Sequence, residues 1–496
     1  MKDIYNKDRK IFFELLEDKQ IKKEDIPFLC EVLGSSKNEE DIYQVYRFFR
    51  NNPEYIDYDA ISKTTGIDKD VLVEIFTKNP VKSYFPVANK NDADIITAYI
   101  FKLSKKSHKH AFIEKDGIDN VRSLIDDGKI PIKDFFVIFD KGFTGNSYLL
   151  SVVAGLLLDD KVLSDYAFTG EVNKKGDIIP VNFLEAKRKA CNEKGLKLIS
   201  PQEVQNIDEL TFFMGSKEMD VPFLVLNKDK TEIERSLEKI EQIIKKTKAQ
   251  YSLDKLLKIF SLEKEDFYVE TSNVAPQEEV WMSLLNRVKD KLQKIYSSLN
   301  HPKITLHIAT SIASLSVGIG VILGIKRSYV IYHFQNEEYF PVLHLDTPQS
   351  LRSLKQTTKD ILEHQEFINI DMHIENSESI NLILHLASHN PVADVVSFTK
   401  NQSYVYISDK RSQGNLPLDE ELWRGYLSEV YSLINILKAR YLIKSFDLFI
   451  SCPSAMALAL GMIVGNYFDI NVYNYYRNLP EKYFRVFNIT ELETPF

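Results

Sequence analysis

Residues 449–468 read FISCPSAMALALGMIVGNYF, an uncharged run that begins like a strand, passes through Ser-Cys-Pro-Ser and continues as a helix of small apolar residues. Residues 304–325, ITLHIATSIASLSVGIGVILGI, follow the same pattern. Each run has about the 20 apolar residues that cross a bilayer. We interpret both as buried strand–turn–helix units, because a spanning helix needs no polar break in its first third. No contact with a membrane is therefore expected.

These two runs belong to an internal repeat. SVGIGVILG (316–324) aligns with ALALGMIVG (457–465) at an offset of 141 residues (465 minus 324), and IYHF from 331 aligns with VYNY from 472 at the same offset. After a slightly longer hairpin, YFPVLHL aligns with YFRVFNI. Each copy predicts a strand, an apolar helix and a hairpin, which is typical of an α/β core with a parallel sheet. Two pseudo-symmetric halves would place equivalent loops around one ligand. Such an arrangement favours a ligand that is itself cyclic or symmetric.

Composition excludes several classes of protein. The 496 residues suggest about three domains, and 30 Phe and 25 Tyr are too many for a disordered chain. A net charge of −8 argues against binding of duplex DNA. Cys30, Cys191 and Cys452 lie too far apart for a disulfide framework or a metal site, so a cytoplasmic location is expected. The N-terminus MKDIYNKDRK lacks the apolar segment of a signal peptide.

Four regions follow from the patterns along the chain. Residues 1–82 have helical periodicity. From Ala60 they predict two short helices around a glycine turn, but acidic residues stand where a DNA-binding helix needs basic ones. Residues 83–227 alternate strands and helices, including FFVIF, YLLSVVAGLLL and a hairpin formed by YAFTGEV and DIIPV. Residues 228–262 predict a helical connector with one apolar stripe, and residues 263–496 contain the repeat.

The segment YAFTGEVNKKGDIIPVNFLEAKRKACNEKGLKLISP resembles the proteolytic domain of Lon-family Ser–Lys proteases. The matching positions are Thr169, Gly170, Glu171, Gly176, Pro180, Lys187, Ala190, Gly195 and Pro201. The resemblance implies an α+β protease domain in which Lys187 is the general base and Thr169 orients it. The sequence contains no GxxxxGK[ST], so proteolysis would not be driven by ATP.

Two residues compete for the role of nucleophile. An alignment without gaps places Thr144 at the family's serine position, whereas a gap of three residues places Ser147 there. We prefer Ser147, because it directly precedes the predicted helix 148–158, whose free N–H groups can stabilise an oxyanion. The alternative is that Ser147 caps this helix and Lys187 is a solvated lysine. The proline and alanine that usually flank the family's nucleophile are missing here.

The repeat region resembles SAVED domains, which fuse two CARF-like Rossmann-type units. LFISCPSAMALALGMIVG, VYNYYR and FRVFNI carry this resemblance. The whole chain resembles the CRISPR-associated Lon–SAVED proteases of type III antiviral defence. This implies a hydrolase that needs no cofactor and that a cyclic oligoadenylate, expected to be cyclic tetra-adenylate, activates allosterically. It also implies cleavage of one toxin-like or anti-sigma-type partner protein, with ligand-induced self-association as one route of activation.

The residues themselves suggest where such a ligand binds. Phosphates bind where strand ends meet helix N-termini at the carboxyl edge of a parallel sheet. The predicted turns at this edge and a nearby group for charge and adenine stacking supply Thr310, Ser311, Ser388, His389, Asn390, Arg411, Trp423, Ser451, Pro453 and Ser454, with Lys410 and Arg424 close by. Taken alone, each serine or threonine is more typical of a helix cap, and Trp423 is more typical of packing. The paired turns in the two halves are what favours a ligand site for the whole set.

Together these features predict an α/β multi-domain protein that acts as a ligand-activated serine protease. A rival hypothesis is a sensor with an inactive Lon-like domain that signals by binding alone.

Overall fold

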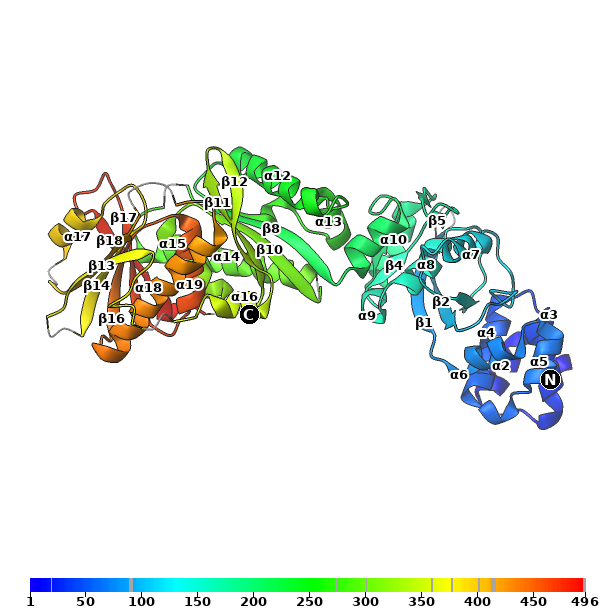
Figure 1. Ribbon diagram of the computed structural model, residues 1–496. Coiled ribbons are helices and arrows are strands. Elements are labelled where there is room, and N and C mark those ends of the chain that lie inside the picture. The colour runs from blue at the N-terminus through cyan, green and yellow to red at the C-terminus, as the bar shows by residue number, and fades with distance from the viewer. Residues whose placement is uncertain are drawn as a thin grey trace. The chain divides into compact units, whose positions relative to one another are not determined.

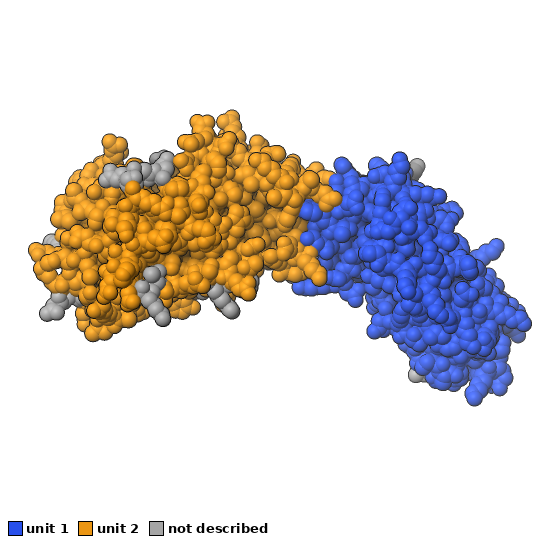
Figure 2. Space-filling model, viewed as in Figure 1, with its two compact units in different colours: residues 1–216 blue, residues 217–496 orange. Residues whose placement is uncertain are grey.

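A computed structural model describes residues 1–18, 20–88, 92–272, 274–299, 301–357, 360–375, 378–399, 402–411 and 416–493. The chain divides into two compact units, residues 1–216 and 217–496 (Figure 2). This boundary precedes the predicted limit at residue 227, because the strand that begins at Glu218 pairs within the second unit.

The first unit begins with the predicted helices. They pack their apolar faces around a core in which Phe12, Val45 and Phe49 are fully buried. Phe101 and Phe136 from the following sheet complete this core, so the helices and the sheet form one unit. The helices are α1 (Lys2–Lys7), α2 (Arg9–Glu17), α3 (Ile26–Ser35), α4 (Glu39–Asn51), α5 (Tyr58–Thr65) and α6 (Lys69–Thr77) (Figure 1).

A five-stranded sheet in the order β3-β2-β1-β4-β7 forms the rest of the first unit. All six residues of β3 are buried, as the continuous apolar run predicts. The strands are β1 (Val81–Ala88), β2 (Ala93–Leu103), β3 (Asp134–Phe139), β4 (Tyr166–Phe168) and β7 (Lys197–Ile199). The helices are α7 (Ile118–Asp126), α8 (Leu149–Leu157), α9 (Asp160–Leu163), α10 (Leu184–Glu193) and α11 (Ile207–Leu210).

The hairpin predicted at residues 166–181 is only partly confirmed. β4 lies parallel between β1 and β7 in the main sheet. Only β5 (Glu171–Val172) and β6 (Ile178–Ile179) pair as an antiparallel hairpin. The chain therefore leaves the sheet at Thr169 and Gly170, which places these two residues at the carboxyl end of a central strand.

The second unit contains the two halves of the repeat, each with its own sheet. The first sheet has the order β12-β11-β10-β8-β9. Its strands are β8 (Glu218–Leu226), β9 (Tyr268–Glu270), β10 (Lys303–Thr310), β11 (Ser328–Gln335) and β12 (Glu338–Leu345). The helices of this half are α12 (Lys230–Thr247), α13 (Leu253–Phe260), α14 (Glu278–Leu299) and α15 (Ala313–Leu323).

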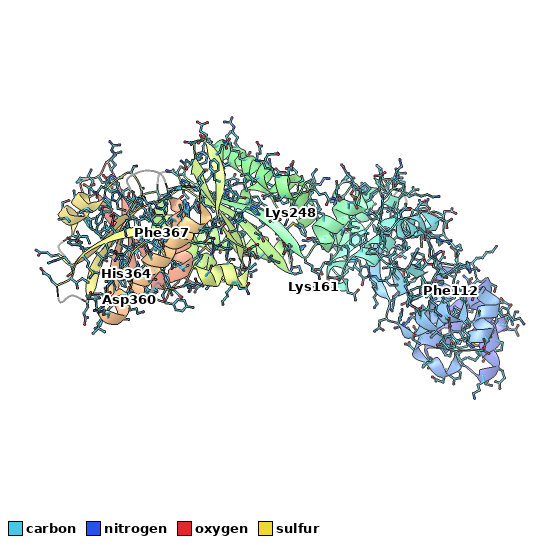
Figure 3. All side chains as sticks on the ribbon, in the orientation of Figure 1. Phe112, Lys161, Lys248, Asp360, His364 and Phe367 are labelled. Atoms are coloured by element: carbon cyan, nitrogen blue, oxygen red, sulfur yellow. The ribbon has the colours of Figure 1, made fainter. Side chains whose placement is uncertain are left out.

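The segment predicted as a connector packs inside this half. The apolar stripe of α12, formed by Ile233, Leu237, Ile240 and Ile244, is buried as predicted. Lys248, which is labelled in Figure 3, lies just beyond the end of α12 and forms an ion pair with Asp220 of β8. Asp220 Oδ1 also lies 2.8 Å from His307 Nε2 on β10. This polar cluster, in which Asp220 and His307 are buried and Lys248 is partly exposed, fixes the end of α12 to the sheet.

The second half has a six-stranded sheet in the order β13-β15-β14-β16-β17-β18. β14, β15, β16 and β17 run parallel, so their carboxyl ends share one edge. The strands are β13 (Ile368–His373), β14 (Ser379–His385), β15 (Tyr404–Asp409), β16 (Ser445–Ser451), β17 (Asp469–Tyr475) and β18 (Tyr483–Asn488). The helices are α16 (Pro348–Ser353), α17 (Val392–Phe398), α18 (Glu420–Arg440) and α19 (Ser454–Val464).

The predicted repeat is confirmed down to local irregularities. Residues 304–325 form β10 and α15, and residues 449–468 contain the end of β16 and α19. The hairpins β11–β12 and β17–β18 each carry a register shift, between Ile331 and Tyr332 in one and between Val472 and Tyr473 in the other. These positions differ by the same 141 residues as the helices, so the two copies share a bulge as well as a strand order.

The helices α15 and α19 join the two halves through direct backbone contact (Figure 1). A Cβ atom on Gly320 would lie 2.1 Å from the carbonyl oxygen of Leu458, and one on Gly461 would lie 2.1 Å from that of Val317. The repeat offset relates Gly320 to Gly461 and Val317 to Leu458. The contact therefore has a local pseudo-twofold axis, and glycine is required on both sides of it.

The repeat also includes the two tryptophans of the chain. Trp281 in α14 and Trp423 in α18 are both fully buried. Each indole Nε1 donates to a backbone carbonyl six residues earlier, that of Ala275 at 3.0 Å and that of Pro417 at 2.7 Å. The two residues are equivalent anchors of the helices that precede β10 and β16.

The α/β multi-domain class is confirmed by these sheets. Within the described ranges, none of the helices combines the length and the apolarity that crossing a membrane requires.

The contact between α15 and α19 gives a stability prediction. Gly320→Ala and Gly461→Ala should each lower the free energy of unfolding of the second unit by roughly 1–3 kcal/mol, because the obstacle is rigid backbone. Gly155→Ala in α8 is the control, and its cost is measured on the unfolding of the first unit; its Cβ would lie 2.3 Å from Cδ1 of Ile100, the end of a side chain, and at an ordinary contact distance of 3.6 Å from Ser83 Cβ. Denaturant unfolding measures all three. Equal costs for the three variants would contradict the close helix contact.

Candidate functional site

The side chain of Lys187 is buried in the first unit. It lies on α10 and is 4% exposed. Its Nζ donates a hydrogen bond of 2.9 Å to Oγ1 of Thr169, which is itself fully buried. Burial lowers the pKa of Lys187 to about 8, since removal from water disfavours the charged amine. Lys187 is therefore not a solvated surface lysine, and a useful fraction of it is neutral near neutral pH.

Ser147 occupies the turn before α8 and is partly exposed. In the described part of the chain, α8 receives no side-chain cap, so Ser147 does not act as one. Thr144 is exposed and lies three residues earlier in the same loop. The hydroxyl of Ser147 is thus not committed to capping, which is the alternative that the sequence left open.

Backbone hydrogen bonds tie the Ser147 turn to the Thr169 segment. Gly170 N donates to Ser147 O at 2.9 Å, and Leu150 N donates to Gly170 O at 3.0 Å. A Cβ on Gly170 would lie 3.2 Å from Leu150 Cδ2 at the start of α8 and 2.7 Å from Ile178 Cγ2 on β6, so the close approach of these two elements favours glycine. Ser147 is thus linked to Gly170 by a backbone hydrogen bond, Gly170 is bonded to Thr169 in the sequence, and Thr169 accepts the hydrogen bond from Lys187. The structure therefore brings the three predicted catalytic residues into one region at the end of β4.

In the second unit, the predicted turns of the two halves meet. Ser454 Oγ, at the start of α19, donates to Thr310 O at the end of β10 with a distance of 2.6 Å. Thr310 Oγ1 accepts from Ser316 Oγ at 2.8 Å. Ser311 is exposed, and its hydroxyl accepts from Asn227 N at 2.6 Å. The strand ends of both halves thus lie at one shared site.

The third predicted turn lies beside Ser451. Ser451 Oγ donates to His389 O at 2.5 Å, and Leu386 N donates to Ser451 O at 2.7 Å. Ser388, His389 and Asn390 are exposed, and Asn390 Oδ1 accepts from Val392 N at 3.0 Å. This turn therefore extends the shared site along the carboxyl edge of the second sheet.

Sequence reasoning missed three residues of this site. Ser314 Oγ donates to Asn474 Oδ1 at 3.0 Å, which adds a second bond between the halves. The half-buried ring of Tyr475 lies 5.0 Å from the imidazole of His389, with 43° between their planes. The repeat contained the signal, because VYNY ends a parallel strand at the same edge.

The helices α15 and α19 both begin at this site. Their N-terminal neighbours are Ile312 and Pro453, and within the described residues neither helix has a side-chain cap. Uncapped first turns leave backbone N–H groups that attract anions. The site therefore combines two helix ends and several hydroxyl groups, which suit phosphates, with the rings of Tyr475 and His389, which suit bases. This combination fits a ligand that carries both phosphates and bases.

The predicted group for charge and stacking does not join this site as expected. Trp423 is fully buried, so its face is not available to a base, and the prediction for this residue is wrong. Its role is to anchor α18, as Trp281 anchors α14. Lys410 donates to Gln365 O. Arg411 is exposed, and its guanidinium lies 5.7 Å from the centre of the Phe367 ring.

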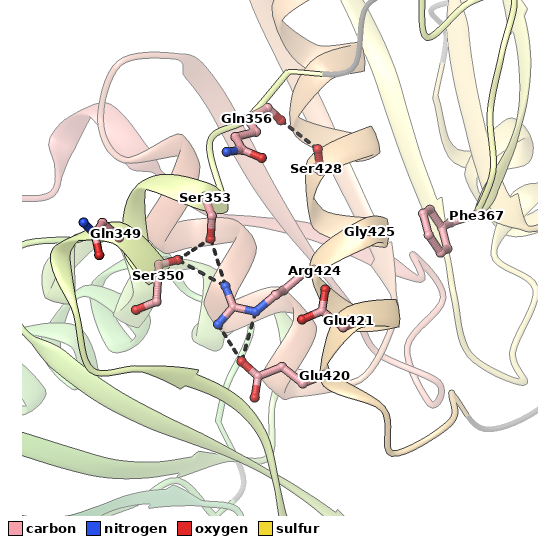
Figure 4. A pocket seen from close by; sticks show the side chains of 10 residues that line it. All are labelled: Gln349, Ser350, Ser353, Gln356, Phe367, Glu420, Glu421, Arg424, Gly425 and Ser428. Carbon is pink, nitrogen blue, oxygen red and sulfur yellow. Dashed lines mark hydrogen bonds and ion pairs between the residues drawn. The ribbon is translucent and has the colours of Figure 1, made fainter.

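Arg424 has a structural role beside a separate cavity. The cavity has a volume of about 770 Å³ and lies alongside α18, which contributes half of its lining residues (Figure 4). Arg424 donates to Glu420 Oε1 at 2.9 Å, to Ser350 O at 3.1 Å, to Ser353 Oγ at 3.0 Å and to His344 O at 2.8 Å. Its donors are thus engaged in holding the segment around α16 against α18.

Comparison with known proteins identifies the sensor part of the chain. Residues 284–489 match the model of the SAVED family, described as the SMODS-associated and fused to various effectors sensor domain. This range is a SAVED domain and contains most of both repeat halves, so the SAVED prediction is confirmed. Comparison with curated proteins finds no match.

Three solved structures are similar over parts of the chain. The Acinetobacter baumannii Cap4 SAVED/CARF-domain containing receptor with 3'3'3'-cAAA is 17% identical, covers 43% of this chain and 44% of that chain, and has a TM-score of 0.33. The same receptor with 2'3'3'-cAAA is 16% identical, with coverages of 54% and 51% and a TM-score of 0.36. A further structure of the receptor is 13% identical, with coverages of 83% and 94% and a TM-score of 0.33. The chain spans about half the length of the first two.

The burial of Lys187 gives a prediction that does not depend on activity. In a ¹³C NMR titration of protein labelled at lysine Cε, one resonance should titrate near pH 8 and should be missing in Lys187→Arg. Thr169→Val removes an acceptor that stabilises the ammonium form, so it should lower this pKa further. A Lys187 resonance that titrates near 10.5, the ordinary value for lysine, would show a solvated side chain.

Proposed function

We propose that this protein is a Ser–Lys protease of prokaryotic antiviral defence that a cyclic oligoadenylate activates through the SAVED domain. The observation that carries the protease part is the buried amine of Lys187, hydrogen-bonded to Thr169 with its pKa lowered to about 8. Holding a buried amine in its charged form costs folding free energy, and such a cost is typical of a catalytic base. The sensor part rests on the SAVED match over residues 284–489.

The ligand binds where the two halves of the SAVED domain meet. The first turns of α15 and α19 bind phosphates through backbone N–H groups, and the hydroxyls of Ser311 and Ser454 add polar contacts. Tyr475 and His389 supply the stacking surface for an adenine that Trp423 cannot supply. The pseudo-twofold relation of the two helix ends suits a ring with repeating phosphates. Rings of three and of four adenylates are both compatible with this chemistry, and cyclic tetra-adenylate remains the predicted form.

The reaction is acyl transfer to Ser147. Neutral Lys187 takes the proton of Ser147 Oγ as this oxygen attacks the scissile carbonyl carbon. The backbone N–H groups of the turn just before α8 stabilise the oxyanion, since those of Leu149 and Leu150 already donate to Asn146 O and Gly170 O. Protonated Lys187 then gives its proton to the leaving amine, and a water molecule hydrolyses the acyl-enzyme by the same route in reverse. Thr169 accepts a hydrogen bond from Lys187 and so orients the amine.

The substrate is one partner protein, of the toxin-like or anti-sigma type that the family resemblance implies. Activation requires that the ligand favour one of two states of the protein, typically by about 1–3 kcal/mol. Self-association of ligand-bound SAVED domains is one route, because it raises the local concentration of protease and substrate.

The dyad predicts a specific pattern of variants. With a cyclic oligoadenylate present, labelling of new protein N-termini in a lysate should reveal a cleaved protein, and Ser147→Ala and Lys187→Ala should each reduce its formation at least about 1,000-fold. The double variant should be no worse, because the two residues act as one unit. The cleavage rate should rise about tenfold per pH unit and level off above about pH 8, since Lys187 must lose its proton.

Thr144→Ala is the matched control and should retain cleavage. If Ser147→Ala is active and Thr144→Ala is not, the nucleophile is Thr144. If all variants match the wild type, or if no new terminus forms with ligand, the first unit is an inactive scaffold.

A further inference from the structure

We propose that Ile179 and Phe183 form an apolar lip beside the dyad, which receives an apolar side chain of the substrate next to the scissile bond. This inference rests on the proposed protease function and specifies the class of substrate: a protein segment with a hydrophobic residue at the cleavage site.

The first observation is exposure. Ile179 is 38% exposed and Phe183 is 44% exposed. Between residues 92 and 216, all of which the structure describes, no other large hydrophobic side chain is exposed. Single exposed hydrophobic residues are ordinary on protein surfaces. Here, however, the two that this region has lie four residues apart, on the segment that leads into the helix of Lys187.

The second observation is position relative to the proposed dyad. Phe183 directly precedes α10, and its carbonyl accepts from Lys187 N at 3.1 Å. Ile179 lies on β6 and pairs with Glu171 on β5. Glu171 follows Thr169 by two residues. One member of the apolar lip is therefore tied to the backbone of Lys187, and the other is tied to the segment that carries the hydroxyl partner of Lys187.

The third observation is backbone strain at Phe183. Its φ of 61° and ψ of 36° place it in the left-handed region, which is unfavourable for a bulky side chain. Between residues 92 and 216 it is the one described non-glycine residue with positive φ. Strained residues of this kind cluster at functional sites. Glycine would fit this backbone better, so an exposed aromatic ring at this position points to a role for the side chain itself.

Together these features indicate recognition of an apolar group. The segment between the two residues contains Pro180, Val181 and Asn182, of which only Asn182 is polar. A peptide whose scissile carbonyl lies at Ser147 would place its neighbouring side chain close to the dyad, where the apolar lip offers the exposed hydrophobic surface. Burial of both surfaces would favour an apolar residue over a charged one.

The test uses the full-length protein with a cyclic oligoadenylate and two dipeptidyl boronic acids, which carry a leucine or an alanine side chain next to boron. Binding forms a bond between Ser147 Oγ and boron, which becomes tetrahedral and negatively charged, and the serine proton passes to Lys187. Calorimetry should give a Kd at least tenfold lower for the leucine compound. Phe183→Gly should reduce this preference below threefold and leave the Kd of the alanine compound within twofold, without lowering the Tm.

Two controls make the result specific. Phe183→Leu should keep most of the preference, because an apolar side chain remains. Ile11→Ala removes another exposed hydrophobic side chain, 47% exposed on α2, and should change nothing.

The outcomes separate the two proposals. If Phe183→Gly keeps the tenfold preference, the apolar lip is not the recognition surface. The same holds if Phe183→Gly only changes the mass measured by light scattering, which would make these residues an interface between copies. If the wild type binds neither compound, or if Ser147→Ala binds them equally well, the proposed protease function fails, and the apolar lip falls with it.

Discussion

The contact between the backbones of α15 and α19 determines the arrangement of the second unit. Because Gly320 and Gly461 carry no side chains, each helix lies against the main chain of the other, and the two repeat halves are held in a fixed pseudo-twofold relation. Helices packed at this distance leave little room for adjustment, so a shift in one half must be transmitted to the other. The first turns of both helices therefore face one site at the carboxyl edges of the two sheets.

That arrangement explains how a sensor can respond to one ligand with both halves. The bonds from Ser454 to Thr310 and from Ser314 to Asn474 cross between the halves at the place where the helices begin. A ligand that binds both helix ends would replace or rearrange these bonds. The first unit has a different constraint, the buried amine of Lys187, which needs a functional reason because burial penalises its charge. The proposed function connects these two features.

The sequence predicted the parts of the fold that have a strong local signal. The offset of 141 residues located both strand–helix units, because small-residue helices with glycine at equivalent positions leave a recognisable pattern. The sequence did not reveal that β8 belongs to the first sheet of the second unit, since the residues of a buried strand do not indicate which strand it pairs with. The sequence pattern does not separate the two roles open to Trp423, because aromatic residues serve both packing and stacking. Its counterpart Trp281, at nearly the repeat offset, carried the information that separates them.

The most direct test of the central claim is a crystal or cryo-electron microscopy structure of the full-length protein with a cyclic oligoadenylate. Ligand density should contact both helix ends, with phosphates near the backbone N–H groups that follow Ile312 and Pro453 and a base against Tyr475. Density confined to one half, or density in the cavity beside α18, would contradict it.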